Sequence, residues 1–415
     1  TLQIGSSATE GVSTTGLYQA ADGGLIFGGS TDGQMGTTPN IGSTDAWLRK
    51  IDRRGNEVWT TQFGSVDDDS SRVLLPDPDG SGTFVIAPRR NVIPNNPITP
   101  VGAAIYKFDN DGFQQLNATV DFQGVPVTSH AYQGTVDGNG DVYILSWITG
   151  TSSLLTKVDG DNGTTLWQRQ FDGVTDNAVT PYNPEWDRVR LRSIQANAAG
   201  NLVVSGWYSP VVTAPRPCGI CAFIAVYSPA GALLSTTEVN VFAAACGRTQ
   251  EGFVYRVSVA PDQSLWVAGL GGTFSDDAFP QVAKLSADAS TTEWTYCNVS
   301  GTPDSNVFTY PTFTANGDGL ISAYILTFDP DTGDSISSSV ALTRLAPDGT
   351  EVFRREVATT RADSSAAIMY AGSVIEDQQG LLFITGVTDG EFTPGANNGG
   401  EDGFILRLAG DGTVQ

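Results

Sequence analysis

The sequence predicts an all-β fold, a seven-bladed β-propeller of four-stranded antiparallel blades. A unit of roughly 59 residues recurs seven times along the 415 residues, and repeats of that length are typical of propellers. Within each unit, runs of four to six apolar and β-branched residues alternate with turns rich in Gly and Asp. No stretch shows a sustained 3.6-residue apolar period, so we expect almost no helix.

The first repeated element is a strand, a glycine turn and the start of a second strand. It is clearest in residues 45–59, which read DAWLRKIDRRGNEVW. Related phrases begin at Ile105, Leu154, Ile224, Val282, Leu342 and Ile405. The pattern predicts the two outer strands of each blade, C and D.

The second repeated element is a strand, a polar turn and a strand rich in Val, Ile, Leu and aromatic residues. It predicts the two inner strands, A and B, so that each unit supplies two hairpins and therefore one blade. Its copies are residues 17–27, 73–86, 132–147, 193–207, 257–269, 312–324 and 372–386.

The two ends of the chain predict how the ring closes. Blade 7, about residues 370–415, has strands A, B and C, but the sequence stops at Gln415 partway into strand D. The first residues, TLQIG, match TTQFG at 60–64, where strand D of blade 1 ends. We therefore expect residues 1–5 to complete blade 7 beside strand C at 404–408, in a single domain spanning 1–415. Such closure removes exposed strand edges that favour aggregation.

The repeated phrases resemble the SBBP repeat, which is named for seven-bladed β-propellers. The residues that carry the resemblance are DAWLRKID at 45–52, GNEVW at 55–59 and FGSVDDD at 63–69, followed by a Val-rich hairpin. It covers all seven units and is weakest in blade 4, where Val226 replaces the usual Lys. SBBP repeats are similar to those of secreted and cell-surface proteins, mostly bacterial, with largely unassigned activities. The resemblance therefore implies a fold and an extracellular location, and it implies no catalytic residue.

Composition agrees with an extracellular, acidic protein. The formal net charge is −23 and the pI is about 4.2. Such a charge disfavours nucleic acid and anionic membranes as partners, and it favours cations or basic surfaces. The sequence contains no run of 18 apolar residues, so it predicts no membrane-spanning helix. Because the sequence begins at Thr1 without a charged and then apolar leader, we expect any signal peptide to have been removed or to lie outside it.

Four cysteines fall on one predicted face of the ring. Cys218 and Cys221 lie in the B-to-C loop of blade 4, Cys246 lies beyond its strand D, and Cys297 ends strand D of blade 5. A zinc site with four thiolates usually has a second C-x-x-C pair, which this sequence lacks. Two disulfides are the favoured interpretation. They join Cys218 and Cys221 to Cys246 and Cys297 in some order, or include a local Cys218–Cys221 bridge.

Acidic residues predict at most a calcium site, the one cofactor that the sequence suggests. Asp329, Asp331 and Asp334 are spaced as in a calcium loop, but Asp is also an ordinary turn residue that bonds its own backbone. Acids also recur just before the inner strands. They either ring the channel mouth as a cation or sugar site or, as their repetition favours, accept backbone hydrogen bonds between blades. They are Glu10, Asp69, Glu251, Asp304 and Asp363.

The inventory of reactive side chains is small. His130 is the one histidine, so a Ser-His-Asp or Cys-His arrangement could form only around it. Carboxylate pairs for glycoside chemistry remain a possible arrangement because acids are abundant. Sequons predict glycosylation, if the source glycosylates its secreted proteins, at Asn117, Asn162 and Asn298.

Two classes of function follow. The favoured one is a non-catalytic extracellular binding or scaffold propeller, an adhesion module or a structural subunit of a cell-surface layer or filament. Its partners are proteins, like subunits or glycans, contacted through long B-to-C loops on one face. Those loops are residues 30–44, 88–102, 208–221, 327–338 and 387–401. The alternative is a polysaccharide hydrolase or lyase with a carboxylate site on the same face.

The disulfide interpretation makes a direct prediction. Thiol counting on the denatured, unreduced protein should find no free thiol, because all four cysteines are expected to be oxidised. Four titratable thiols, or zinc bound in stoichiometric amount by elemental analysis, would contradict it.

Overall fold

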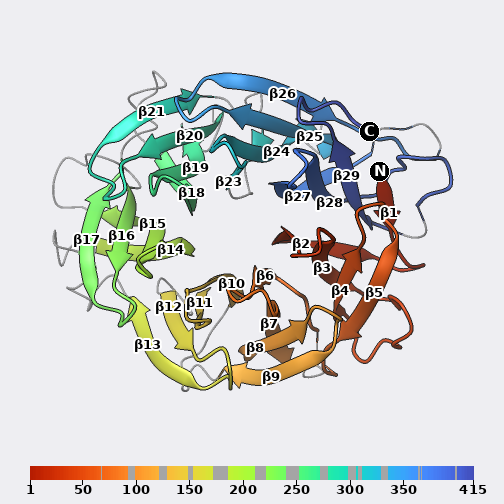
Figure 1. Ribbon diagram of the computed structural model, residues 1–415, viewed down its shortest axis with the longest axis horizontal. Coiled ribbons are helices and arrows are strands. Elements are labelled where there is room, and N and C mark those ends of the chain that lie inside the picture. The colour runs from red at the N-terminus through yellow and green to blue at the C-terminus, as the bar shows by residue number, and fades with distance from the viewer. Residues whose placement is uncertain are drawn as a thin grey trace.

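The computed structural model shows a ring of β-sheets around a central axis (Figure 1). It describes residues 1–66, 68–91, 99–120, 129–147, 153–171, 186–210, 221–239, 252–271, 279–297, 305–306, 311–328, 335–362, 365, 367–397 and 400–415. These residues contain strands and turns and no helix, so none of them forms a helix that could cross a lipid bilayer.

Seven blades follow each other around the ring, as the sequence predicts, and in each of them the chain runs from the hub outward. Blades 1 to 3 comprise β2 (Glu10–Gln19), β3 (Leu25–Thr31), β4 (Asp45–Ile51), β5 (Glu57–Phe63); β6 (Val73–Pro76), β7 (Gly82–Asn91), β8 (Thr99–Asp109), β9 (Gln114–Val120); and β10 (Ser129–Val136), β11 (Val142–Trp147), β12 (Ser153–Val158), β13 (Thr165–Phe171). Blades 4 and 5 comprise β14 (Trp186–Ala196), β15 (Leu202–Pro210), β16 (Cys221–Tyr227), β17 (Leu233–Glu238); and β18 (Gly252–Val259), β19 (Leu265–Gly271), β20 (Phe279–Leu285), β21 (Thr292–Cys297). Blades 6 and 7 comprise β22 (Ser305–Asn306), β23 (Thr312–Phe313), β24 (Gly319–Phe328), β25 (Ser335–Leu345), β26 (Glu351–Val357); and β27 (Met369–Glu376), β28 (Leu382–Thr388), β29 (Asp402–Leu408), β1 (Leu2–Ile4).

Two small departures from the simple pattern involve blades 1, 2 and 6. The inner strands of blades 1 and 2 meet at one parallel bridge, Thr15 to Val73, which links their sheets into one of eight strands. In blade 6, two short segments, β22 and β23, pair with β24 in place of one continuous inner strand. Neither departure changes the order of the blades.

The core consists of contacts between the facing sheets of neighbouring blades. One apolar cluster joins blades 2 and 3, with Phe84 and Ile105 against Ile144. The next joins blades 3 and 4, with Leu155 against Leu191. Middle strands are therefore covered on both faces, and every residue of β12 is buried. This two-sided burial explains why the middle strands are apolar throughout rather than alternating.

The recurring basic residue of strand C ties the outer half of a blade to its inner hairpin. Lys50 lies 2.7 Å from Asp22 in the A-to-B turn, and Arg344 contacts Asp318 at the same distance. The equivalent pairs in other blades are Lys107–Asp77, Lys157–Asp137 and Lys284–Asp262. The repeated basic residue of the sequence therefore has a structural role in blades 1, 2, 3, 5 and 6.

A second repeated contact joins neighbouring blades. Trp59 of β5 packs on Gly112 in the C-to-D turn of blade 2, and its indole Nε1 donates to Asn110 O at 3.0 Å. Trp167 and Trp294 make the same bond to Pro229 O and Pro347 O, at 3.3 and 2.9 Å. We call this contact the seam: an outer-strand side chain resting on the glycine turn of the following blade.

The N-terminal strand closes the ring, as the sequence predicts. β1 pairs antiparallel with β29, with Leu2 opposite Ile405 and Ile4 opposite Gly403. The side-chain amide of Gln3 donates to Gly390 O at 2.9 Å and to the Asp402 carboxylate at 3.1 Å. In blade 1 the side-chain amide of Gln62 makes the matching bonds to Gly33 O at 3.0 Å and to the Asp45 carboxylate at 2.9 Å. The match between TLQIG and TTQFG therefore reflects equivalent positions in strand D.

Strand D of blade 7 is made from both ends of the chain. Val414 forms a β-bridge to Leu408, and the backbone N–H of Gln415 donates to Arg407 O at 3.0 Å. The C-terminal residues thus cover one end of β29 while β1 covers the other. In the figure the two termini lie close together on the outer rim (Figure 1).

Removing residues 1–5 tests this closure. The deletion exposes the edge of β29 and should lower the melting temperature by several degrees or cause aggregation, measured by thermal unfolding with light scattering. Removing Thr1 alone is the control, because Thr1 precedes β1, and it should change little. Equal melting temperatures for the two deletions would contradict closure by β1.

Candidate functional site

The inner strand of blade 4 carries an unusual run of arginines, Arg188-Val189-Arg190-Leu191-Arg192. Successive side chains of a strand point to opposite faces. Leu191 is fully buried in the cluster shared with blade 3, so Arg190 and Arg192 point away from blade 3 and toward blade 5. β14 and β18 pack against each other, which brings this basic face to the inner strand of blade 5.

Aromatic rings hold two of these arginines. The Arg190 guanidinium lies over the Trp207 ring, 5.4 Å from its centre, and Arg192 lies over Tyr255 at the same distance. Arg256 is adjacent and donates to Tyr255 O at 3.2 Å. We call these five residues the hub cluster. Stacking restricts each guanidinium and holds its plane against the face of the ring.

Side-chain hydrogen bonds fix the two inner strands relative to each other. The amide of Val257 donates to Ser193 Oγ at 3.2 Å, and the amide of Val259 donates to Gln195 Oε1 at 2.6 Å. These bonds satisfy backbone groups on the inner edge of β18 and set the spacing between Arg192 and Tyr255. The hub cluster is therefore built on rigid strands rather than on a loop.

The charge in the hub cluster is opposite to that of the whole protein. Its three guanidinium groups are half-buried on a chain with a net charge of −23. Burial raises the pKa of the Tyr255 hydroxyl, and the positive charge of Arg192 offsets this only in part. The phenol is thus protonated at neutral pH and can act as a hydrogen-bond donor. Guanidinium and phenol donors together suit a carboxylate or sulfate group.

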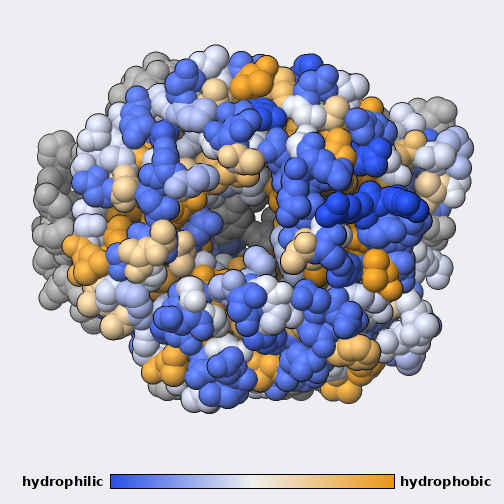
Figure 2. Space-filling view, viewed as in Figure 1, coloured by the Kyte–Doolittle hydropathy of each residue, from blue (hydrophilic) through white to orange (hydrophobic). Residues whose placement is uncertain are grey.

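The hub cluster lies just inside the face that bears the B-to-C loops. Trp186 pairs with Pro210, where the loop of blade 4 begins, and Gly252 pairs with Gly271 at the corresponding point of blade 5. Arg190 pairs with Trp207 and so lies only a few residues in from that rim. Figure 1 shows β14 and β18 at the edge of the central opening, and Figure 2 shows that the centre of the molecule is hollowed.

The structure describes two of the B-to-C loops at length, and hydrogen bonds from their backbone amides hold both in place. In blade 1, Asp45 accepts the amides of Ile41 and Gly42 at 2.7 and 3.2 Å. In blade 7, the amide of Glu391 donates to Thr360 O at 2.7 Å. These loops therefore present an ordered rim.

Two of the predicted ring acids have a structural role. Glu10 accepts the Ser6 amide at 2.9 Å and the Thr31 hydroxyl at 2.9 Å, and it is fully buried. Asp69 accepts the Ser65 amide at 2.6 Å in the equivalent connection. In these two places the acid accepts a backbone hydrogen bond from the connection between blades, as the repetition favoured. Glu251, Asp304 and Asp363 lie outside the described residues.

Most of the predicted site residues lie outside the described part of the chain. This holds for Asp329, Asp331 and Asp334, for Cys218, Cys246 and Asn298, and for the side chains of His130 and Cys221. Cys297 ends β21 and is disulfide-bonded, and its pairing stays a prediction. Asn117 and Asn162 are exposed. Within the described ranges, no group of three or more His, Cys, Asp or Glu side chains forms a metal site.

The sequence analysis missed the hub cluster. Its signal was the alternation of arginine with apolar residues in β14, in a chain where Lys and Arg together number only 22. Tyr255 lies far along the sequence, in the next blade, and only the ring geometry brings it to Arg192.

Comparison with known proteins supports the fold and assigns no family. No family model matches the chain, and no curated protein matches it. Among solved structures, a PL25 ulvan lyase bound to -[GlcA(1-4)Rha3S]- is similar, with a TM-score of 0.52, 10% identity, and 99% of this chain and 97% of that chain covered. The polysaccharide lyase Uly1 gives a TM-score of 0.51 and 9% identity, covering 96% and 90%. The propeller domain of a Pyrococcus furiosus protease gives 0.47 and 8%, covering 98% and 97%.

The structural role of Glu10 can be tested by substitution. Glu10→Ala leaves the partly buried Ser6 amide without its acceptor and should reduce the free energy of unfolding by about 1–3 kcal/mol, measured by urea titration. The control Glu57→Ala removes an exposed carboxylate paired with Arg49 at 3.3 Å and should cost less than about 1 kcal/mol. Equal costs for the two variants would show that the Glu10 carboxylate is not needed for the connection.

Proposed function

We propose that the protein is an extracellular binding propeller that holds an acidic polysaccharide at the hub cluster. The observation that carries the proposal is the pair of ring-stacked arginines, Arg190 and Arg192, on the inner strand of blade 4. An acidic chain that runs across the B-to-C loop face would bring its carboxylate or sulfate groups to these guanidinium groups.

The sign of the local charge favours this ligand over the basic partners that the net charge suggests. The acidic groups are spread over the ring, and several are bonded within it, as in the Lys50–Asp22 and Arg344–Asp318 pairs. Ions in solution largely screen charges that lie more than about 8–10 Å apart. A ligand at the hub cluster therefore interacts mainly with the nearest charges. Binding should therefore weaken as salt is added.

Two further observations agree with a carbohydrate ligand on an outer surface. One similar solved structure, the PL25 ulvan lyase, was determined with an acidic, sulfated sugar chain. At 10% identity this likeness shows a shared fold alone, so the proposal depends on the arginines of this chain. The resemblance of the repeats to SBBP repeats supports a secreted or cell-surface location, and the ordered rim supports adhesion or assembly as the role.

A polysaccharide lyase is the second candidate. Elimination removes the C5 proton of a uronate, breaks the C4–O bond to the next sugar and leaves a C4–C5 double bond. Tyr255 beside Arg192 is the described residue nearest to such chemistry. Burial raises its pKa, which disfavours the phenolate form that would take up that proton. This observation favours binding without turnover.

The binding proposal can be tested with defined polymers. The probes are polygalacturonate, dextran sulfate and neutral dextran, with affinity measured by titration calorimetry. The Arg190→Gln, Arg192→Gln double variant should lose at least about tenfold in affinity for an acidic polymer, because each charged hydrogen bond contributes about 1.5–3 kcal/mol. Arg355→Gln, an exposed arginine on outer strand β26, is the matched control and should bind normally.

The outcomes separate the two candidates. Binding of an acidic polymer without cleavage supports the proposal, provided that the melting temperature of the double variant is unchanged. Unsaturated uronate ends, detected by their ultraviolet absorbance and lost in Tyr255→Phe, would establish the lyase instead. Equal affinity for neutral dextran, or no loss in the double variant, would refute the hub cluster as the binding site.

A further inference from the structure

Tyr370 is an exposed aromatic side chain on the inner strand of blade 7, β27. Its neighbours along the strand, Met369 and Ala371, are buried in the cluster shared with blade 6, whereas 38% of Tyr370 is exposed. The ring of Tyr324, from blade 6, packs edge to face against it, with 5.5 Å between the ring centres. The contact restricts the Tyr370 ring while part of the ring remains open to solvent.

Strand register places Tyr370 at the position that Arg190 has in blade 4. Arg190 pairs with the residue after Gly206, and Tyr370 pairs with the residue after Gly386. The two glycines are equivalent, because each pairs with a phenylalanine of strand C. A Cβ on Gly206 would overlap Arg190 O, and one on Gly386 would overlap Tyr370 O. Both side chains therefore leave their strands at the same level of the channel, near the B-to-C loops.

The two positions lie on opposite sides of the central opening. Blades 5 and 6 separate blade 4 from blade 7, and Figure 1 shows β14 and β27 across the opening from each other. The adjoining inner strand of blade 1, β2, has Gly11 at the same position, where it pairs with Ser30. Blade 1 therefore has no side chain at this level to cover Tyr370. A chain that crosses the opening from Arg190 meets the exposed part of this ring.

We propose that Tyr370 is a second subsite for the acidic polysaccharide, where one sugar ring of the bound chain stacks on the phenol ring. The inference rests on the proposed function and adds an aromatic contact to the charged one. The face of an aromatic ring is electron-rich, so it attracts the weakly positive C–H groups on the face of a sugar ring. A uronate carries its carboxylate at the edge of the ring, so one chain can meet Arg190 through a charge and Tyr370 through a stacked face.

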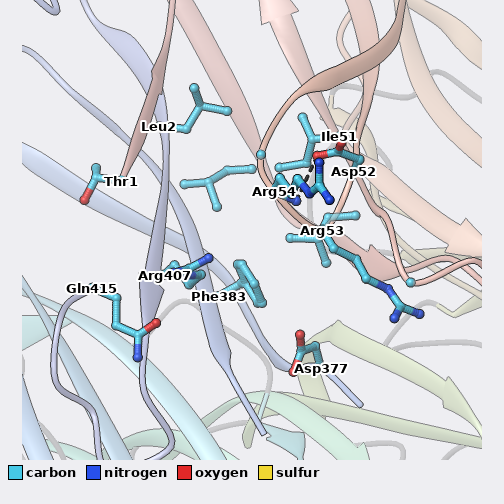
Figure 3. Close-up of a pocket in the computed structure, with 14 residues that line it drawn as sticks. Thr1, Leu2, Ile51, Asp52, Arg53, Arg54, Asp377, Phe383, Arg407 and Gln415 are labelled. Carbon is cyan, nitrogen blue, oxygen red and sulfur yellow. Dashed lines mark hydrogen bonds between the residues drawn. The ribbon is translucent and has the colours of Figure 1, made fainter. Parts of the chain in front are cut away.

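A separate group of arginines lies at the other face of the ring. Arg53, Arg54 and Arg407 line a pocket together with Asp52 and Asp377 (Figure 3). These residues belong to the A-to-B and C-to-D turns and to the strand end beside them, whereas the proposed subsite lies toward the B-to-C loops. A chain bound across the loop face does not reach them. They therefore provide a control for general attraction between an acidic polymer and basic side chains.

Oligogalacturonates of increasing length test the subsite in the intact chain by titration calorimetry. The affinity of the unmodified protein should rise once the oligomer is long enough to reach from the hub cluster to Tyr370. Tyr370→Ala should weaken binding of the long oligomers by about three- to tenfold and leave binding of digalacturonate unchanged. Tyr370→Phe keeps the ring and should bind normally. The controls Phe113→Ala, which removes an exposed ring from the C-to-D turn of blade 2, and Arg53→Gln should also bind normally.

The outcomes distinguish this subsite from the hub cluster. Unchanged binding of long oligomers by Tyr370→Ala, with a loss in the Arg190→Gln, Arg192→Gln double variant, would overturn the subsite and leave the hub cluster standing. A loss in Tyr370→Ala without a loss in the double variant would support the stack and refute the hub cluster. Equal losses for digalacturonate and long oligomers, or an equal loss in Phe113→Ala, would overturn the subsite. If Tyr370→Ala is destabilised, Tyr370→Leu, which keeps the bulk without the ring, should show the same selective loss.

Discussion

The ring depends on the seam, where a side chain from the outer strand of one blade rests on the glycine turn of the next. Gly112, Gly231 and Gly349 all have φ near +80°, a conformation that strains other residues, and an added Cβ would also meet the indole. The same glycine thus shapes the turn and admits the ring. Indole hydrogen bonds to a backbone carbonyl then fix how far each blade can slide along its neighbour. The repeated Gly and Trp of the sequence are two halves of one contact.

The blades are not equal in this respect, and the differences coincide with the candidate sites. In blade 4, Val226 replaces the basic residue of strand C, and Ser235 opposite it replaces the seam aromatic. Blade 4 therefore lacks both the basic residue of strand C and the seam aromatic, and the hub cluster lies at its junction with blade 5. Sites that depart from a regular local pattern are often functional ones. At the junction of blades 7 and 1, strand D of blade 7 is formed by residues from both ends of the chain.

Much of the fold could be predicted because each local signal in the sequence agrees with its neighbours. Hairpin turns set the strands, the repeat set the number of blades, and the glutamine shared by TLQIG and TTQFG forms equivalent bonds in both places. The sites were harder to predict. Arg190 and Arg192 can be assigned to a face only after Leu191 is known to be buried on the other. Tyr255 reaches Arg192 through the curvature of the ring, which no local pattern encodes.

Amide hydrogen exchange at the outer strands measures the contribution of the seam directly. If the seam holds the ring together, exchange should be slow in β5, β13 and β21, whose tryptophans are docked, and fastest in β1 and residues 413–415. Uniform exchange across all outer strands, or β1 as protected as β5, would contradict the account.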